Sequence, residues 1–342
     1  MAVRLALTMG DPSGIGPEIC LGALEAASEV GAQAVIVGDA AVLRRAAEVI
    51  GGDHALTSAG AIDALPPEGH CVLDLHNVDA AHHEFGRVKA EYGRASVEYL
   101  KTAVGMCLGD RAGAIVTAPI NKEALKAAEV PEPGHTEMLG TFTGTDVYET
   151  MFMVERMRIF FATRHLSLKG AIDAITQDGL LRTLDNVRNA LKLMGLEEPE
   201  IAVAALNPHG GEGGLFGDEE IVAIRPAVEA AKNRGWRVVG PIPADSIFAQ
   251  HRRGKYDAVL SLFHDQGHIA SKTVDFDGTV SVTTGLPIIR TSVDHGTAFD
   301  IAGQGIADPG NMQSAVRRAV ELHMSMGEAL RSLREKTNNG RR

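Results

Sequence analysis

Short apolar runs rich in β-branched residues recur along this chain, and segments with a helical pattern separate them. The runs that have the length of buried strands span residues 3–9, 34–38, 114–119, 158–163, 201–206 and 257–263. Strands that alternate with helices are typical of a parallel or mostly parallel sheet with helices on both faces. The pattern therefore predicts an α/β fold.

Two of the intervening segments repeat their apolar residues at helical spacing. The segment 95–109 places Val97, Leu100, Val104 and Leu108 on one face, and 181–195 does the same with Leu184, Val187, Leu191 and Met194. Gly195 is the predicted C-cap of the second helix. With 342 residues, the chain exceeds the length that one hydrophobic core usually serves, so two lobes are expected.

The net charge excludes one class of function. The chain carries 33 basic and 44 acidic residues, a net charge of −11, whereas a nucleic-acid binder needs a basic face. The three cysteines, at 20, 71 and 107, are odd in number and far apart, which favours reduced thiols in the cytoplasm. No apolar run has the length of a signal peptide or a membrane span. We therefore expect a cytoplasmic protein with no nucleic-acid or membrane partner.

Three histidines follow predicted strands. His165 comes after "RIFFAT", His209 after "IAVAAL" and His264 after "DAVLSLF". In open α/β sheets, ligands bind beyond the carboxyl ends of the strands, so the three side chains could meet in one crevice. Three imidazoles with a free fourth position are typical of a catalytic zinc site. The alternative is that these are hydrogen-bonded loop histidines.

Two aspartates near these histidines are candidates for proton transfer or for orienting a metal ligand. Asp265 adjoins His264, and Asp245 lies in "PADS", which could equally be a helix cap. The histidines without a strand-end setting are expected at the surface: His54, His70, His82, His83, His251 and His323.

A glycine-rich stretch near the C-terminus, "DHGTAFDIAGQGIADP" at 294–309, resembles the coenzyme loop of the isocitrate and isopropylmalate dehydrogenases, and this resemblance implies a nucleotide site. Glycines let the backbone wrap an adenosine, and Asp300 can accept hydrogen bonds from ribose hydroxyls while repelling a 2′-phosphate, which favours NAD over NADP. The usual dinucleotide, Walker, zincin and esterase motifs are missing from the sequence. A glycine-rich helix-capping loop is the alternative.

The first strand leads into "GDPSGIGPEI", a tight turn containing Gly10, Gly14 and Gly16. Pro17 and Glu18 would open the following helix, whose N-terminus could take an anion. Further candidates for contacts with a carboxylate or phosphate are His135 and Thr136 in "PGHTEMLG", Lys272, and Arg290 after "GLPII". Taken separately, each of these side chains could simply be solvated.

The 294–309 stretch closely resembles the coenzyme loop of the isocitrate and isopropylmalate dehydrogenases. The matching positions are His295, Gly296, Ala298, Asp300, Ala302, Gly303 and Pro309. The whole chain, from about residue 3 to about residue 320, resembles the 4-hydroxythreonine-4-phosphate dehydrogenase family of pyridoxine biosynthesis and its catabolic relatives. The motifs that carry this resemblance are "GDPSGIGPE", "TAPINK", "GHTE", "TRHL", "NPHGGEGG", "PADS", "HDQGH" and "GLPIIRTSVDHGTAFDIAG".

The resemblance implies two α/β/α lobes with mostly parallel mixed sheets, similar to isocitrate dehydrogenase, with the active site in the interlobe cleft at a homodimer interface. The lobes would span 1–125 with 283–342, and 126–282. The cofactors would be NAD, bound along the loop with Gly14, and a divalent ion (zinc, magnesium or cobalt). Residues of both subunits would share that ion: His165, His209 and His264. The substrate-binding positions would be His135, Thr136, Lys272 and Arg290.

One position departs from the family. Ser281 stands where the biosynthetic members usually carry an asparagine that contacts substrate, and serine lacks the two amide N–H donors. This leaves the substrate open between 4-hydroxythreonine phosphate, threonate or erythronate 4-phosphate, and a cyclic dihydrodiol carboxylate.

The expected reaction is oxidation of a secondary alcohol to a β-keto acid, followed by loss of carbon dioxide. A metal-dependent lyase or hydrolase of phosphorylated sugar acids, without nicotinamide, is the alternative, and a non-catalytic anion-binding protein is another.

Overall fold

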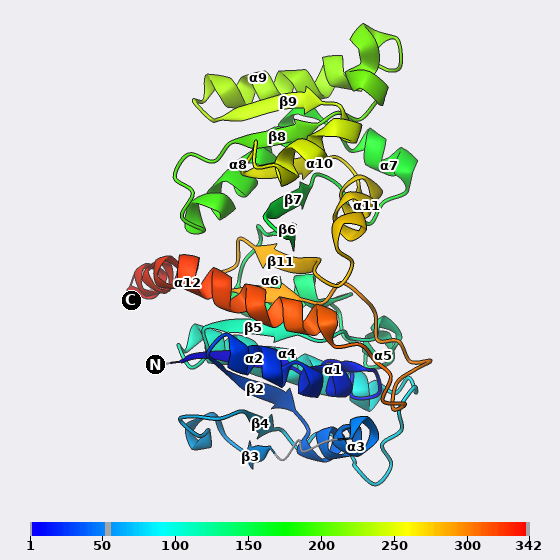
Figure 1. The fold of residues 1–342 in the computed structure, drawn as a ribbon, viewed down its shortest axis with the longest axis vertical. Coiled ribbons are helices and arrows are strands. Elements are labelled where there is room, and N and C mark those ends of the chain that lie inside the picture. Colours follow the sequence, from blue (N-terminus) through cyan, green and yellow to red (C-terminus); the bar gives the residue numbers. More distant parts are fainter. Residues whose placement is uncertain (1, 52–55, 340–342) are drawn as a thin grey trace. The chain divides into compact units, whose positions relative to one another are not determined.

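The structure is a computed structural model that describes residues 2–51 and 56–339 (Figure 1). The chain divides into two compact units. Unit 1 comprises Met1–Asp146 and Leu286–Arg342, and unit 2 comprises Val147–Gly285. Residues 126–146, which the expected lobe boundary assigned to the second lobe, thus belong to unit 1. That the two lobes are separate folding domains stays a prediction.

Unit 1 contains a parallel sheet in the order β3-β4-β2-β1-β5-β12. The strands are β1 (Val3–Thr8), β2 (Ala32–Gly38), β3 (Thr57–Ala59), β4 (Cys71–Asp74), β5 (Ala114–Thr117) and β12 (Arg290–Ser292). The chain passes from β1 to β2 on one side and later adds β5 on the other side of β1. The carboxyl ends of β1 and β5 therefore flank a topological switch point, where open α/β sheets bind their ligands.

Helices cover this sheet because its central strands are mostly apolar and buried. β2 is buried at every residue, as expected of a parallel strand that is covered on both faces. α4 packs against β1, β2 and β5, and α12 packs against β5 and β12 (Figure 1). The helices are α1 (Gly16–Gly22), α2 (Leu24–Glu29), α3 (Ala40–Ile50), η1 (Ile62–Ala64), α4 (Ala90–Leu108), α5 (Lys122–Ala127), α6 (His135–Thr143) and α12 (Gly310–Asn339).

Unit 2 contains a mixed sheet in the order β11-β6-β7-β10-β8-β9. β6 runs antiparallel to both of its neighbours, and β7, β10, β8 and β9 are parallel. The strands are β6 (Glu149–Val154), β7 (Met157–Phe161), β8 (Ile201–Ala204), β9 (Val238–Ile242), β10 (Ala258–Ser261) and β11 (Val280–Thr284). The helical segments are α7 (Leu168–Asp173), α8 (Gln177–Leu193), η2 (Pro208–Gly214), η3 (Glu220–Ile224), α9 (Arg225–Asn233), α10 (Ala244–Arg252) and α11 (His264–Val274).

The predicted α/β class with mostly parallel mixed sheets is confirmed. The six predicted runs form β1, β2, β5, β7, β8 and β10, while the remaining strands were missed because they are short or partly exposed. The predicted C-cap was wrong by one residue, since α8 is capped at Met194 and Gly195 follows it with φ +88°. Within the described part of the chain, no helix is long and apolar enough to span a membrane.

Candidate functional site

The three strands that precede the predicted metal ligands are neighbours in unit 2. β10 lies between β7 and β8 and is parallel to both. Because parallel strands end at the same edge of a sheet, the segments after them emerge together. His165 follows β7, His264 opens α11 after β10, and His209 follows β8.

Side-chain hydrogen bonds connect these strand ends. Thr163 Oγ1, two residues before His165, donates to Leu262 O at 2.8 Å. Leu262 N in turn donates to Gln266 Oε1 at 2.7 Å, and Gln266 Nε2 donates to Ala205 O at 2.8 Å. One glutamine amide thereby joins the end of β10 to the end of β8, and both of its polar atoms are used. Sequence reasoning missed Gln266, although it lies inside the "HDQGH" motif.

Two of the three predicted metal ligands lie close together within one chain. The ring centroids of His165 and His264 are 6.1 Å apart. His264 Nδ1 lies 2.8 Å from Asp265 Oδ1, and the ring of His268 stacks on His264 at 3.5 Å. A carboxylate on one ring nitrogen fixes the orientation of an imidazole and leaves the other nitrogen for a metal. Asp265 therefore has the geometry of a residue that orients His264.

His209 is exposed in a loop with unusual backbone geometry. Its φ is +53°, and Gly210, Gly211 and Gly213 also have positive φ. Beneath the loop, the fully buried Glu220 accepts hydrogen bonds from Leu206 N at 2.8 Å and Asn207 N at 2.7 Å. A Cβ on Gly211 would lie 2.8 Å from Glu220 Oε2, so the loop closes tightly around this carboxylate. Nothing in the local sequence pattern marks Glu220 for this role.

The observed residues fit part of a metal site. Two imidazoles that bind one ion at ~2.1 Å have ring centroids roughly 5–6 Å apart, close to the separation of His165 and His264. Among the described residues of a single chain, no group of three or more His, Cys, Asp or Glu side chains is arranged to hold a metal ion. The chain alone thus brings two of the three predicted ligands together, and His209 is not among them.

The other candidates in unit 2 have different surroundings. Asp245 is exposed in the first turn of α10, where Pro243 is the N-cap, so it does not cap the helix. The Lys272 ammonium lies 5.0 Å from the ring centroid of Phe276. Ser281 is half-buried on β11, opposite Phe152 on β6.

In unit 1, β12 carries a buried arginine. Arg290 Nε and Nη2 donate to Thr117 Oγ1 at 3.1 and 2.8 Å, and burial lowers the Arg290 pKa to about 10. Thr117 Oγ1 donates to Ser292 Oγ at 2.8 Å. An arginine held in place in this way is suited to binding an anion.

His135 and Thr136 open α6, also in unit 1. Burial, and then the charge of Arg290, hold the pKa of His135 well below its usual value, so the imidazole is neutral. Its buried Nε2 has no hydrogen-bond partner among the described residues. A neutral imidazole with an unsatisfied nitrogen is a plausible contact for a polar substrate group.

The predicted coenzyme loop has both exposed and anchored residues. Gly296 and Asp300 are exposed, and His295 Nδ1 lies 3.0 Å from Gly296 O. Gly303 N, by contrast, donates to Glu18 Oε1 at 2.6 Å. Gly14 is buried, and a Cβ there would lie 3.0 Å from Thr297.

Three backbone amides of the turn after β1 are already hydrogen-bonded. Ser13 N donates to Asp11 Oδ1 at 2.8 Å, Gly14 N to Asp11 O at 3.1 Å, and Ile15 N to Thr297 O at 3.0 Å. An anion at the N-terminus of α1 would have to bind other amides, and it stays a prediction. Asp11 is itself fully buried, and burial raises its pKa to about 6, although the Ser13 N–H opposes the shift.

The expected exposure of the remaining histidines was partly wrong. His83 and His251 are 3% and 1% exposed. His83 Nε2 lies 2.9 Å from Pro12 O, and burial lowers the His251 pKa to about 4. His82 is exposed, His70 and His323 are half-buried, and His54 lies outside the described residues.

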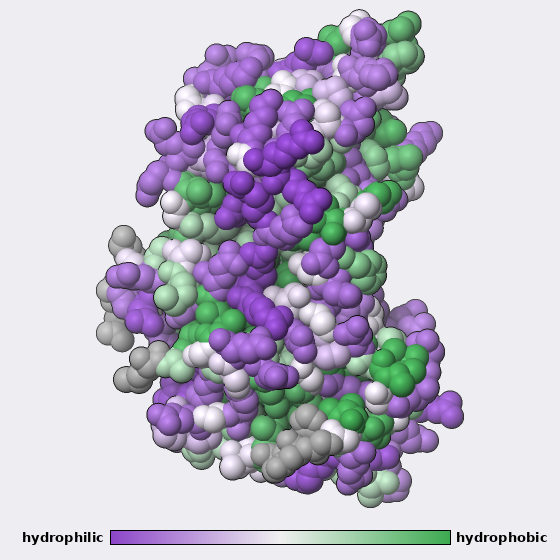
Figure 2. Space-filling model, in the orientation of Figure 1, coloured by the Kyte–Doolittle hydropathy of each residue, from purple (hydrophilic) through white to green (hydrophobic). Residues whose placement is uncertain are grey.

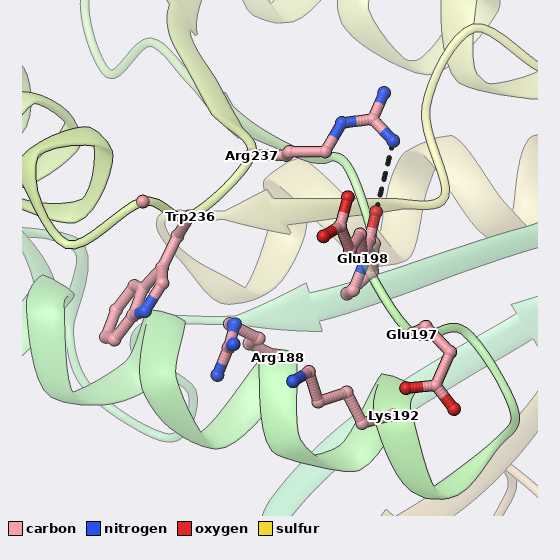
Figure 3. Close-up of a pocket in the computed structure, with 8 residues that line it drawn as sticks. Arg188, Lys192, Glu197, Glu198, Trp236 and Arg237 are labelled. Carbon is pink, nitrogen blue, oxygen red and sulfur yellow. Dashed lines mark hydrogen bonds between the residues drawn. The ribbon is translucent and has the colours of Figure 1, made fainter.

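A further pocket of about 200 Å³ lies in unit 2, away from the predicted residues (Figure 3). Arg188 and Lys192 rise from α8 on one side of it. Its lining consists of Arg188, Lys192, Glu197, Glu198, Pro199, Gly235, Trp236 and Arg237. None of the predicted site residues is among them.

Comparison with known proteins identifies the class. Residues 31–319 match the family model described as "Pyridoxal phosphate biosynthetic protein PdxA". The chain is 49% identical over 322 residues to a Cutibacterium acnes protein named "Putative D-threonate 4-phosphate dehydrogenase", covering 93% of each chain. A Halalkalibacterium halodurans protein of the same name is 48% identical, covering 93% of this chain and 96% of the relative.

A solved structure agrees. The crystal structure of 4-hydroxythreonine-4-phosphate dehydrogenase from Klebsiella pneumoniae superposes with a TM-score of 0.87 at 39% identity, covering 94% of this chain and all of the other. The chain belongs to the PdxA family. The three relatives named above are all called dehydrogenases.

Proposed function

We propose that this chain is a metal-dependent and NAD-dependent dehydrogenase of a 4-phosphorylated hydroxy acid, with D-threonate 4-phosphate as the first candidate. The observation that carries the proposal is the pair of imidazoles, His165 and His264, at the shared edge of β7 and β10. This pair of histidines occurs in a chain that is 49% identical to a protein named "Putative D-threonate 4-phosphate dehydrogenase".

The choice of substrate rests on Ser281. An asparagine at this position would present two N–H donors, and the serine hydroxyl presents one. A substrate with a hydroxyl where 4-hydroxythreonine carries its amino group suits that change, since a hydroxyl both donates and accepts.

A terephthalate dihydrodiol dehydrogenase from Burkholderia xenovorans superposes less well, with a TM-score of 0.63 at 29% identity, so we place the cyclic dihydrodiol acids behind the phosphorylated acids.

The histidines of unit 2 would hold the divalent ion: His165, His209 and His264. Such an ion supplies Lewis-acid polarisation of a substrate hydroxyl. Asp265 orients His264 through the 2.8 Å contact with Nδ1, and Gln266 keeps the end of β10 beside the end of β8. Asp245 and Asp265 are the proposed proton-transfer groups, because both are exposed carboxylates on the segments that follow β9 and β10.

Arg290, His135, Thr136 and Lys272 are the proposed contacts for the anionic ends of the substrate. The guanidinium of Arg290 stays charged even with its lowered pKa of about 10, and the two hydrogen bonds to Thr117 fix its plane. The neutral His135 adds a polar contact without a second positive charge.

The reaction would proceed by transfer of a hydride from the alcohol carbon and of the hydroxyl proton to a base, which leaves a ketone β to the carboxylate. NAD, held along the 294–309 loop, would supply the hydride acceptor. The β-keto acid then breaks its bond to the carboxyl carbon and releases carbon dioxide, and the electron pair of that bond forms an enolate that takes up a proton to give the ketone. Asp300 is exposed, and an acid at this position would accept hydrogen bonds from ribose hydroxyls and repel a 2′-phosphate, so we propose NAD rather than NADP.

We propose a homodimer with shared metal sites. Large apolar side chains are exposed in the segments that follow the three histidines, within 1 to 12 residues of them, and this set is called the apolar rim here: Leu166, Leu168, Leu215, Phe216, Ile269 and Phe276. Exposed apolar side chains over α7 and over the segment after β8 are visible as green groups (Figure 2). A second copy of the chain would cover this rim and complete the ligand set, which one chain leaves at two imidazoles.

The buried, unpaired cysteines at 20, 71 and 107 support a cytoplasmic location.

A panel of substrates tests the activity. Purified protein is supplied with NAD, zinc or magnesium, and one of four acids: D-threonate 4-phosphate, erythronate 4-phosphate, 4-hydroxythreonine phosphate or a dihydrodiol carboxylate. We expect the fastest NADH formation with D-threonate 4-phosphate, with one carbon dioxide released for each NADH. Product formed without nicotinamide would contradict the proposal.

Mixing inactive variants tests the shared site. His165→Ala, His209→Ala and His264→Ala are made separately and then co-expressed in pairs. If two ligands of one ion come from different chains, the mixed dimers rebuild one intact site, so about a quarter of the wild-type activity returns. A shared site predicts recovery in at least one pair. No recovery in any pair would place all ligands within one chain.

A further inference from the structure

A buried glutamate from the N-terminal part of unit 1 holds the glycine-rich loop near its C-terminus. Glu18, in the first turn of α1, is 2% exposed. Its Oε1 accepts a hydrogen bond from Gly303 N at 2.6 Å, and its Oε2 accepts one from Gly305 N at 3.0 Å. Both carboxylate oxygens are thus bonded to one loop, across 285 and 287 residues of sequence.

The backbone geometry of the loop requires glycine at these two points. Gly303 and Gly305 have φ of +77° and +69°, in the left-handed region that other residues rarely adopt. A Cβ on Gly303 would lie 2.5 Å from Phe85, and one on Gly305 would lie 2.7 Å from Val49 O. The two amides can therefore reach the carboxylate only because both residues lack a side chain.

The same short segment approaches the loop at two further places, Thr297 and Pro309. Ile15 N donates to Thr297 O at 3.0 Å. A Cβ on Gly14 would lie 3.0 Å from Thr297, and one on Gly22 would lie 2.7 Å from Pro309. Contacts with residues 14–22 thus occur near the start of the loop, at Gly303 and Gly305 in its second half, and at its end. The stretch between Ala298 and Ala302 makes none of these contacts.

We infer that Glu18 is the positioning residue of the coenzyme loop, and that Gly303 is an anchor of this loop rather than a contact for the cofactor. The inference rests on the proposed NAD-binding function. The Gly303 and Gly305 amides donate to Glu18, so NAD is bound by the part of the loop that precedes these two glycines, around Gly296 and Asp300. Glu18 sets the shape of that part without touching the reacting atoms.

Glu18→Gln tests the inference, because glutamine has nearly the same volume but offers a donor where one loop amide needs an acceptor. Glu25→Gln, an exposed glutamate in the first turn of α2, is the matched control. Amide hydrogen exchange at Gly303 and Gly305 is measured in the NAD-free protein, together with NAD affinity and the KM and kcat for NAD.

In Glu18→Gln we expect about tenfold faster exchange at both glycine amides and about a tenfold higher KM for NAD. The kcat should stay within about twofold, since the groups that act on the substrate are untouched, and Glu25→Gln should match the wild type. Unchanged exchange, or a fall in kcat with an unchanged KM for NAD, would overturn the inference. Glu18→Asp keeps the charge with a shorter reach and should give an intermediate KM if Glu18→Gln folds poorly.

The design separates two failures. Should the wild type neither bind nor reduce NAD, the proposed function fails, and the coenzyme part of this inference fails with it. Hydrogen exchange still decides whether Glu18 holds the loop. Should the wild type use NAD while Glu18→Gln behaves like the control, only the role of Glu18 is lost.

Discussion

Two fully buried carboxylates, one in each unit, have pKa values that are shifted in opposite directions. Asp11, in the turn after β1, accepts one N–H bond at Oδ1 from Ser13, and its buried Oδ2 has no partner among the described residues. Burial raises its pKa to about 6. Burial also works to raise the pKa of Glu220, but hydrogen bonds from Asn207 and Leu206 outweigh it, and the pKa is lowered.

The comparison indicates that converging N–H donors can outweigh the effect of burial on the pKa of a carboxyl group. Glu220 organises the His209 loop because the backbone amides of that loop converge on it. Asp11 has an incompletely satisfied carboxyl in a turn where Gly14 N donates to the backbone oxygen of Asp11 and Ile15 N donates to Thr297 O. The two groups should therefore couple stability to pH with opposite sign.

The largest expected effect is that of Asp11→Asn on stability. A carboxyl whose pKa rises from 3.8 to about 6 on folding costs the folded state nothing below pH 3.8 and about 3 kcal/mol above pH 6. Asparagine keeps the acceptor for Ser13 N. The gain in unfolding free energy from Asp11→Asn should therefore grow by about 2 kcal/mol between pH 4, where the unfolded carboxyl is already partly ionised, and pH 7, measured by urea unfolding at each pH.

The exposed Asp173 supplies the control substitution for this series, Asp173→Asn. An effect of Asp11→Asn that does not depend on pH would break the comparison, since it would mean that the Asp11 charge is satisfied in the folded protein.

The next largest effect is expected from His209→Ala. Loss of a metal ligand should lower kcat by at least about 100-fold and reduce the bound zinc, while NAD affinity stays within about twofold. Metal content by atomic emission and NAD binding by calorimetry check this. Intact metal content and turnover would remove His209 from the site. A parallel loss of NAD affinity would show that the loop carrying His209 and the 294–309 loop are not independent.

Glu220→Gln should destabilise the protein by about 2 kcal/mol at pH 7, because a charged acceptor of several buried N–H groups is lost. The pKa of Glu220 is lowered on folding, so its contribution is present above the unfolded value of 4.5 and fades as pH falls through the lower folded pKa. The effect of the variant should therefore shrink toward acid pH, as urea unfolding at pH 4 and pH 7 would measure.

Glu219→Gln is the matched control, since among the described residues the Glu219 side chain accepts a hydrogen bond only from the Asn207 side-chain amide, at 2.6 Å. It should cost less than Glu220→Gln at pH 7. If the two neighbours behave alike, the convergence of backbone amides on Glu220 is not what stabilises the loop.

The smallest effect is expected from Ser281→Asn, which touches neither buried carboxylate. The ratio of kcat/KM for D-threonate 4-phosphate to that for 4-hydroxythreonine phosphate should fall by about tenfold, because the amide supplies a second donor. Stability should stay within about 0.5 kcal/mol of the wild type. An unchanged ratio would remove Ser281 from the determinants of substrate choice.

Local patterns in the sequence predicted much of this molecule. Apolar runs such as 201–206 predicted strands because burial on both faces needs continuous apolar residues, and histidines after three of these runs predicted a site at one edge of a sheet. Short strands such as β3, three residues with two exposed, carry too weak a pattern to be found in this way.

Sequence alone determined the α/β class and the edge on which the histidines lie, because hydrophobic periodicity and strand ends are local properties of the chain. Only the tertiary structure decided that β10 lies between β7 and β8 and that His165 comes near His264. It also decided that Glu220 binds the backbone of the loop that carries His209, and that Glu18 accepts hydrogen bonds from glycines 285 and 287 residues away. Hydrogen bonds between remote segments depend on the order in which strands pack, and packing order follows from the whole core rather than from any one stretch of residues.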